Sequence, residues 1–161
     1  MTERGAIAGT LEALARNGVK FLVAGGVAAQ LYGSRRLTMD LDIIPSLAAK
    51  DWRRLLAALR ELGFSPTGAA WVEIENVTRL RKWARPRDAI SIRFTRKKPP
   101  LTIDVLFAEG TRFHELVHGA KRAVEGDLQM LIVGKADLIA MKRLAGRPQD
   151  VEDIRAMEAA E

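Results

Sequence analysis

The chain has 161 residues, 48% of them hydrophobic and 29% charged, which is typical of a globular domain rather than a disordered or membrane-embedded chain. At this length we expect one domain. The absence of cysteine excludes disulfides and thiolate ligands or nucleophiles, and the formal net charge of +6 favours polyanionic partners. There is no apolar run long enough to span a bilayer and no secretory signal pattern, so we expect a cytoplasmic protein without membrane contact.

The first part of the chain alternates between helical and extended patterns. Apolar side chains at helical spacing precede Gly18, a β-branched apolar run then ends at two glycines, and Pro45 ends a second such run. Ser46 is expected to cap an amphipathic helix. These patterns predict helix, strand, helix, strand and helix in turn, over residues 6–17, 19–25, 27–33, 37–45 and 47–63.

The remaining sequence predicts more strands and a helical end. A basic linker and Pro99-Pro100 separate strand candidates, and Pro148 restarts a helix after Gly146. Two short strands are expected within 121–134. We therefore expect an α+β fold, an α/β sandwich in which helices pack on a small mixed β-sheet. The other expected strands are 71–77, 89–95 and 101–107, and the other expected helices are 111–119, 135–146 and 148–160.

Basic residues are concentrated in one stretch that contains a single acid, Asp88. The stretch is either a solvated face or hairpin, or a surface that binds a polyanion such as RNA. Trp71 and Trp83 lie beside or within it and either stack on bases or belong to the core. Its nine cations are Arg79, Arg81, Lys82, Arg85, Arg87, Arg93, Arg96, Lys97 and Lys98.

Three aspartates occupy strands where aliphatic residues are the norm. Asp40 and Asp42 project from the same face of their strand, roughly 7 Å apart, so their charges repel unless a cation lies between them. Asp104 lies in the middle of a later apolar strand, and the three acids converge if the two strands are neighbours. Carboxylate oxygens favour Mg²⁺ or Mn²⁺. The alternative is that each is an ordinary strand-end or turn residue.

Gly25 and Gly26 precede a predicted helix whose first amides are free to face an anion. Two glycines alone are often only a turn. Together with the acids they predict a phosphate end and a metal end of one site.

The order of these residues resembles the DNA polymerase β-like nucleotidyltransferase superfamily. Its pattern is a helix-opening Gly-Gly or Gly-Ser, an acid-apolar-acid strand, and a third acid on a neighbouring strand. More closely, "GGVAAQLYGSRRLTMDLDI" together with "KADLIAMKRLAGRPQDVEDI" resembles the bacterial AbiEii-like, toxin-type nucleotidyltransferases. Residues 45–100 carry little of this resemblance.

The resemblance implies a polymerase β-like fold, with a catalytic core at 1–120 and a C-terminal helical part at 121–161. It also implies transfer of a nucleoside monophosphate from an NTP to an acceptor hydroxyl, with Mg²⁺ or Mn²⁺ as cofactor. The implied catalytic and metal-binding residues are Asp40, Asp42 and Asp104, two metal ions stabilising the attacking and leaving oxygens. The implied nucleotide-binding residues are Gly25, Gly26, Ser34, Arg36, Thr38, Lys142 and Arg147.

Other residues receive secondary roles in this interpretation. Lys135 is a weaker candidate for the triphosphate, and Asp150 and Asp153 are expected to position Lys142 or Arg147 rather than bind metal. Larger AbiEii-like proteins carry an additional C-terminal region. The acceptor site is therefore expected to be incomplete, to be built across a homodimer, or to be supplied by the basic stretch through Arg93, Arg96, Lys97 and Lys98.

The segment "HELVH" at 114–118 matches the H-E-x-x-H pattern of zinc proteases. A protease of this kind needs a third ligand, and Lys121 and Val124 stand where the extended motif would supply one. We interpret the two histidines as helix surface.

The acceptor remains open at this stage. The basic stretch favours RNA, most simply a tRNA 3′ end, in a toxin–antitoxin role with an antitoxin partner. A small molecule such as an aminoglycoside, a protein hydroxyl, and a non-enzymatic partner-binding module are the alternatives.

Overall fold

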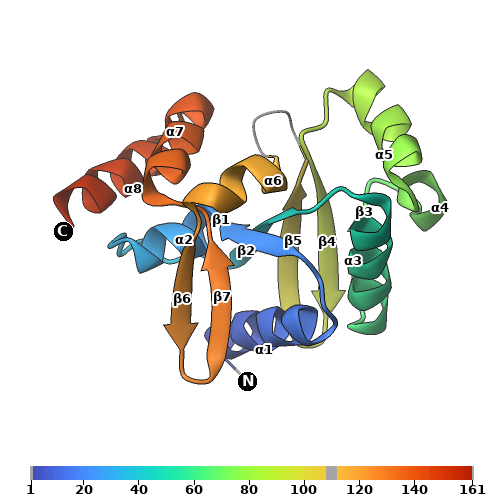
Figure 1. Cartoon of the computed structure of the whole chain (residues 1–161), viewed down its shortest axis with the longest axis horizontal. Helices are drawn as coiled ribbons and strands as arrows, with labels where there is room; N and C mark the ends of the chain where they lie inside the picture. Colours follow the sequence, from blue (N-terminus) through green and yellow to red (C-terminus); the bar gives the residue numbers. More distant parts are fainter. Residues whose placement is uncertain (1, 108–111, 161) are drawn as a thin grey trace.

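The computed structural model describes residues 2–107 and 112–160. Seven strands form one mixed sheet in the order β3-β4-β5-β2-β1-β7-β6, with helices packed against it (Figure 1). The strands are β1 (Phe21–Ala24), β2 (Asp40–Pro45), β3 (Ser65–Thr67), β4 (Ser91–Lys97), β5 (Pro100–Leu106), β6 (Lys121–Glu125) and β7 (Leu128–Ile132). The helices are α1 (Glu3–Arg16), α2 (Gly25–Leu31), α3 (Ala49–Glu61), α4 (Trp71–Ile74), α5 (Val77–Ala84), α6 (Phe113–Leu116), α7 (Lys135–Ala145) and α8 (Pro148–Ala159). This arrangement confirms the expected α+β class.

Strand β2 occupies the middle of the sheet. It runs antiparallel to β1 and parallel to β5, so the two strands that carry the aspartates are neighbours. Leu41 and Ile43 are fully buried, and α1 and α3 contact β5 and β2. Because side chains alternate along a strand, Asp40 and Asp42 face away from this packed core.

Residues 65–87 differ from the prediction. The strand predicted at 71–77 is wrong, because α4 and α5 occupy this region and the strand β3 comes before them. The side chain of Asn76 accepts a hydrogen bond from the backbone N–H of Arg79 and begins α5. Ile74, Leu80 and Ala84 are buried at helical spacing. The basic stretch therefore contains a helix, where a linker was expected.

Two further helix predictions need correction. Ser46 does not cap α3, which begins at Ala49; its hydroxyl instead donates to Asp51 at 2.6 Å. The helix predicted at 111–119 is a short helix, α6, followed by a 3₁₀ turn, η2 (Val117–Gly119). Position 111 lies outside the described residues. A second 3₁₀ turn, η1 (Arg85–Arg87), follows α5.

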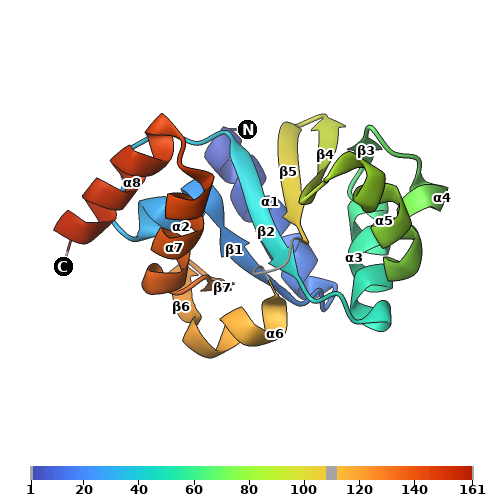
Figure 2. The ribbon, with the colours of Figure 1, turned by 90° about the horizontal axis from the view of Figure 1, so that it is seen from above.

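The C-terminal region follows the prediction closely. The two short strands expected within 121–134 are present as β6 and β7, which pair as an antiparallel hairpin, and β7 pairs with β1, which joins the hairpin to the same sheet. Gly146 ends α7 in a left-handed conformation, and Pro148 begins α8. Both helices contact α2. Figure 2 shows β2 with α7 and α8 on one side and α5 on the other. None of the described helices is long and apolar enough to cross a membrane.

Candidate functional site

Three neighbouring strands place two acids and one arginine in a row across the sheet. Asp42 of β2 pairs with Asp104 of β5, and Asp104 pairs with Arg93 of β4. Paired residues project from the same face of a sheet, so these side chains lie together, with Asp40 two residues from Asp42 on that face. We call these four residues the carboxylate row.

Within the carboxylate row, Arg93 holds Asp104 through a two-point ion pair. Its Nε donates to Oδ1 and its Nη2 to Oδ2, both at 2.9 Å. The same Nη2 lies 3.8 Å from Oδ2 of Asp40. The hydrogen bonds to Asp104 raise the pKa of Arg93 above its ordinary value, so Arg93 stays charged. Its side chain is 52% exposed, whereas that of Asp104 is 16% exposed.

Asp42 is the acid whose charge the protein stabilises least. Burial raises its pKa to about 6, and the charges of Asp104 and Asp40 act in the same direction. Lys142 and Arg147 act in the opposite direction. Asp42 therefore lies where a cation from outside the chain would be most stabilising.

The two glycines are required by packing within the site. Gly25 has a φ of +60°, and a Cβ there would overlap the carboxylate of Asp42. A Cβ at Gly26 would lie 2.7 Å from Oγ1 of Thr38. Helix α2 begins at Gly25, whereas the sequence predicted a start at residue 27. The Gly-Gly thus brings the end of β1 against Asp42 and Thr38.

A second cluster lies on the α7–α8 side. Asp153 accepts hydrogen bonds from Ser34 at 2.7 Å, from Arg36 Nε at 3.2 Å and Nη2 at 2.9 Å, and from Lys142 at 2.8 Å. Burial alone would raise the pKa of Asp153, but these hydrogen bonds outweigh it and hold the pKa at about 2. The residues that contribute come from the loop before β2, from α7 and from α8.

Asp150 completes this cluster. Its carboxylate accepts from Arg147 Nε at 2.8 Å and lies 3.4 Å from Nζ of Lys142. The expectation that Asp150 and Asp153 position Lys142 or Arg147 is therefore confirmed in geometry. We call these six residues, Ser34, Arg36, Lys142, Arg147, Asp150 and Asp153, the cation network. Its three cations exceed its two acids by one positive charge.

No protein-family model matches the chain, and no curated protein is significantly similar to it in sequence. Several solved structures resemble its fold, among them the following two. An antigenic nucleotidyltransferase-like protein from Paracoccidioides brasiliensis superposes with a TM-score of 0.61 at 13% identity, over 96% of this chain and 74% of that chain. The lincosamide antibiotic adenylyltransferase LnuA, with lincomycin bound, gives a TM-score of 0.59 at 12% identity, over 98% and 95%. The chain has a nucleotidyltransferase fold.

The nucleotidyltransferase fold implies a divalent metal ion, and the carboxylate row offers the oxygen ligands that Mg²⁺ and Mn²⁺ prefer. Three carboxylates face one guanidinium there, which leaves two negative charges in excess. Asp40 and Asp42 fit such an ion, since they share one strand face and burial disfavours the charge of Asp42. Asp104 is engaged by Arg93. Within residues 2–107 and 112–160, no three His, Cys, Asp or Glu side chains are grouped closely enough to hold a metal.

The structure separates the residues predicted to bind the acceptor. Arg93 belongs to the carboxylate row, whereas Arg96 faces the other side of the sheet. Arg96 donates to the carbonyl of Pro99 at 2.9 Å and stacks on Phe64, where burial lowers its pKa. Lys97 is exposed and lies four residues from Arg93, roughly 13 Å along the strand. Lys98 follows in the β4–β5 turn.

Helix α5 and the turn after it carry five exposed cations. Trp83 is buried and therefore not available to stack on bases, whereas Trp71 is half-buried and packs against Phe94 with ring centroids 5.8 Å apart. The core alternative is therefore correct for Trp83. In Figure 2, α5 lies on the side of β2 opposite α7 and α8. The exposed cations are Arg79, Arg81, Lys82, Arg85 and Arg87.

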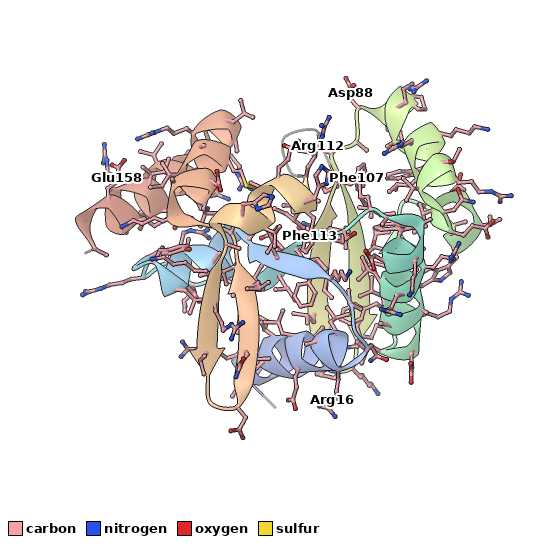
Figure 3. All side chains as sticks on the ribbon, viewed as in Figure 1. Arg16, Asp88, Phe107, Arg112, Phe113 and Glu158 are labelled. Carbon is pink, nitrogen blue, oxygen red and sulfur yellow. The ribbon has the colours of Figure 1, made fainter. Side chains whose placement is uncertain are left out.

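A pocket of about 800 Å³ lies where β2 and β5 end. Its walls include Leu47, Leu80, Phe107 and Phe113, with Arg81 as a charged member. Figure 3 shows Phe107 and Phe113 near one another beside α6. Phe107 follows the last residue of β5 and is three residues from Asp104, roughly 10 Å along the chain, and none of the described residues that line the pocket belongs to the carboxylate row.

The histidine motif does not form a metal site. His114 lies in α6, which has four residues, and His118 lies in the 3₁₀ turn that follows. The continuous helix that H-E-x-x-H requires is therefore interrupted between the two histidines. Lys135, the weaker candidate for a triphosphate contact, holds the end of α8 instead: its Nζ donates to the carbonyl of Ala160 at 2.8 Å.

Proposed function

We propose that the chain is a metal-dependent nucleotidyltransferase that moves a nucleoside monophosphate from an NTP to an acceptor hydroxyl. One observation carries the proposal: a row with excess negative charge lies beside a network with excess positive charge, and Lys142 and Arg147 of that network act electrostatically on Asp42. A metal–triphosphate complex has the complementary arrangement. The likeness in fold to an adenylyltransferase supports the same reaction class.

In this proposal Asp40 and Asp42 hold Mg²⁺ or Mn²⁺, and Asp104 completes the set beside the acceptor. When bound, the ion supplies Lewis-acid polarisation of the phosphoryl oxygens. Asp104 also orients the acceptor hydroxyl and takes up its proton, while the hydroxyl oxygen bonds to the α-phosphorus and the bond from the α-phosphorus to the pyrophosphate oxygen breaks. A cation bound at Asp42 would lower its raised pKa and keep the carboxylate ionised below neutral pH as well.

The cation network binds the triphosphate. Lys142 and Arg147 are held by Asp150 and Asp153, so their charges are fixed in position before the nucleotide arrives. Arg36 is only partly exposed and is held at two points, which suits stabilisation of charge on the leaving pyrophosphate. The remaining proposed nucleotide contacts are Gly25, Gly26, Ser34 and Thr38.

We propose RNA, specifically a tRNA 3′ end, as the acceptor. The exposed cations of α5 and η1 lie across β2 from the cation network, and a surface of that charge attracts a phosphate backbone. Transfer to tRNA would make the chain an AbiEii-like toxin in the bacterial cytoplasm, held in check by an antitoxin. A homodimer would bring a second α5 surface to the same RNA.

A small-molecule acceptor is the second candidate. The pocket where β2 and β5 end is lined mainly by apolar side chains, with Arg81, Arg112 and His114 among them, and has the volume of a drug-sized site. One structural neighbour is an antibiotic adenylyltransferase with lincomycin bound. The basic character of α5 favours RNA over this candidate, because an aminoglycoside is itself cationic.

Incubation with each α-labelled NTP, Mn²⁺ or Mg²⁺ and total bacterial RNA tests the proposal on one denaturing gel. The variant Asp42→Asn should transfer no label. Asp88→Asn is the matched control, since Asp88 is an exposed acid directly after η1 and its φ of 50° suits Asn. Label on RNA supports the tRNA proposal, and label on protein moves the acceptor to a side-chain hydroxyl. If no RNA or protein is labelled, aminoglycosides and lincosamides are tested as acceptors, and failure there leaves a binding module.

A further inference from the structure

Arg93 occupies both oxygens of the one acid that the carboxylate row contributes from β5. The two hydrogen bonds are 2.9 Å each, and the same guanidinium reaches towards Asp40 at 3.8 Å. The cross-strand pairing of Arg93 with Asp104 places this cation in the row by backbone geometry. The positive charge thus lies among the acids where a metal ion would otherwise lie.

A divalent ion and Arg93 are competing partners for Asp104. The two-point contact from Arg93 already engages both oxygens of Asp104, and a divalent ion bound to the same carboxylate would lie close to the guanidinium, where two cations repel each other. Asp40 and Asp42 are not blocked in this way. Both hydrogen bonds from Arg93 to the row go to Asp104, and the distance from Arg93 to Asp40 exceeds that of a hydrogen bond.

We infer that Arg93 is an internal counter-cation that competes with the divalent metal ion for Asp104 and must leave Asp104 before that acid can ligate metal. The inference rests on the proposed function, which supplies the metal ion. It assigns Arg93 a role distinct from binding the acceptor. Since half of its side chain is exposed, Arg93 can move into solvent without disturbing the core.

The affinity for Mn²⁺ alone tests the inference, measured on metal-free protein by calorimetry and by the electron paramagnetic resonance signal of free Mn²⁺. Arg93→Gln should bind Mn²⁺ about tenfold more tightly than the wild type, a change equivalent to about 1.4 kcal/mol. Arg93→Lys, which keeps the charge but loses the two-point geometry, should show a smaller gain. Arg16→Gln is the control for the lost charge, because Arg16 is exposed at the end of α1 (Figure 3) and its ion pair is with Glu12 of the same helix, not with an acid of the row.

Equal or weaker Mn²⁺ binding by Arg93→Gln than by Arg16→Gln would overturn the inference, and so would an absence of Mn²⁺ binding in all proteins. If Arg93→Gln unfolds, the Mn²⁺ affinity of Arg93→Lys is compared with that of Arg16→Lys instead. Tighter Mn²⁺ binding by Arg93→Lys supports the inference, and equal or weaker binding overturns it. The labelled-NTP assay separates the two proposals. Transfer by the wild type without a gain in Arg93→Gln rejects the role of Arg93 alone. A gain in Mn²⁺ affinity without transfer to any acceptor supports the competition and rejects the enzymatic proposal.

Discussion

The carboxylate of Asp42 lies against the backbone of Gly25, in the space that a side chain at position 25 would fill. The first residue of α2 thereby fixes the side chain of the most deeply buried acid of the carboxylate row. A phosphate-binding role for the Gly-Gly was expected from sequence. The structure adds a packing role, which has its own testable consequence.

Gly25→Ala should abolish nucleotidyl transfer and lower the free energy of unfolding, because the new methyl group displaces Asp42 and the backbone is left-handed. The left-handed conformation alone costs about 1–2 kcal/mol for a residue with a Cβ. Gly68→Ala is the matched control, since Gly68 has a φ of +78° and a methyl group there would meet nothing within 4 Å. Chemical denaturation of both variants measures the cost of the left-handed backbone. The transfer assay shows whether the displacement of Asp42 in Gly25→Ala also removes activity. Retention of activity in Gly25→Ala would show that the position of Asp42 is not critical.

Asp42→Asn should stabilise the metal-free protein at neutral pH. The folded-state pKa of Asp42 is about 6, against an ordinary value of 3.8. Between these values the folded state retains a proton that the unfolded state has lost, so this group reduces stability as pH rises from about 4 to 6. A shift of this size corresponds to about 3 kcal/mol, which is an upper bound for the gain.

The measurement is urea denaturation of wild type and Asp42→Asn in EDTA at pH 4 and pH 7.5. The variant should be more stable at pH 7.5 and nearly equal to the wild type at pH 4. Added Mn²⁺ should stabilise the wild type more than the variant, because the ion binds the native carboxylates. A difference in stability that does not change with pH would contradict the raised pKa of Asp42.

Asp153→Asn should have the opposite effect. The pKa of Asp153 is held at about 2, so its stabilising contribution is present at neutral pH and is lost as pH falls from about 4 towards 2. Breaking this buried cluster should cost about 3–5 kcal/mol. It should also raise the KM for NTP, because Arg36 and Lys142 lose the acid that positions them.

The control for Asp153 is Glu158→Gln on the same helix. Glu158 makes an exposed ion pair with Arg143 at 2.8 Å, and such pairs contribute about 0–1 kcal/mol. Thermal unfolding and the KM for NTP are measured for both variants. Equal effects of the two substitutions on thermal stability and on the KM for NTP would mean that the buried Asp153 contributes no more than an exposed ion-paired acid.

Only part of the carboxylate row could be predicted from the sequence. The two-residue period of a strand predicts that Asp40 and Asp42 share a face, and the pattern alone suffices for this. It does not give the pairing of β2 with β5; the resemblance to polymerase β-like proteins implied that neighbour relation. The contact of Arg93 with Asp104 depends on the register of β4 against β5, which no local pattern encodes.

Two other features could not be predicted from the sequence: the ion pairs of the cation network and the helices α4 and α5. Arg36 and Asp153 are 117 positions apart, so their ion pair could not be read from spacing. Just before the basic stretch, the run 71–77 predicts a strand, but the helix cap at Asn76 and the helical spacing of buried side chains prevail. Local β propensity was outweighed by the contacts of α4 with α5, by the hydrogen bond from Trp52 to the carbonyl of Ile74, and by the packing of Trp71 on Phe94.

The acceptor surface leads to the last prediction. If RNA contacts α5, replacing Arg81 and Lys82 by Gln should weaken RNA binding and reduce the slope of log affinity against log salt by about 1.4–1.8, as two lost phosphate contacts imply. The matched variant replaces Lys97 and Lys98, which also removes two exposed charges, but at the β4–β5 turn. Fluorescence anisotropy with a labelled tRNA at several salt concentrations measures both slopes.

The outcome distinguishes two surfaces on the same chain. A smaller slope only for the α5 variant places the acceptor across β2 from the cation network, where a 3′ end can reach Asp104. A smaller slope only for the Lys97 and Lys98 variant moves RNA to the far end of β4, roughly 13 Å from Arg93 along the strand. An unchanged slope in both variants would leave α5 as a solvated helix, and the apolar pocket would then make a small-molecule acceptor the better proposal.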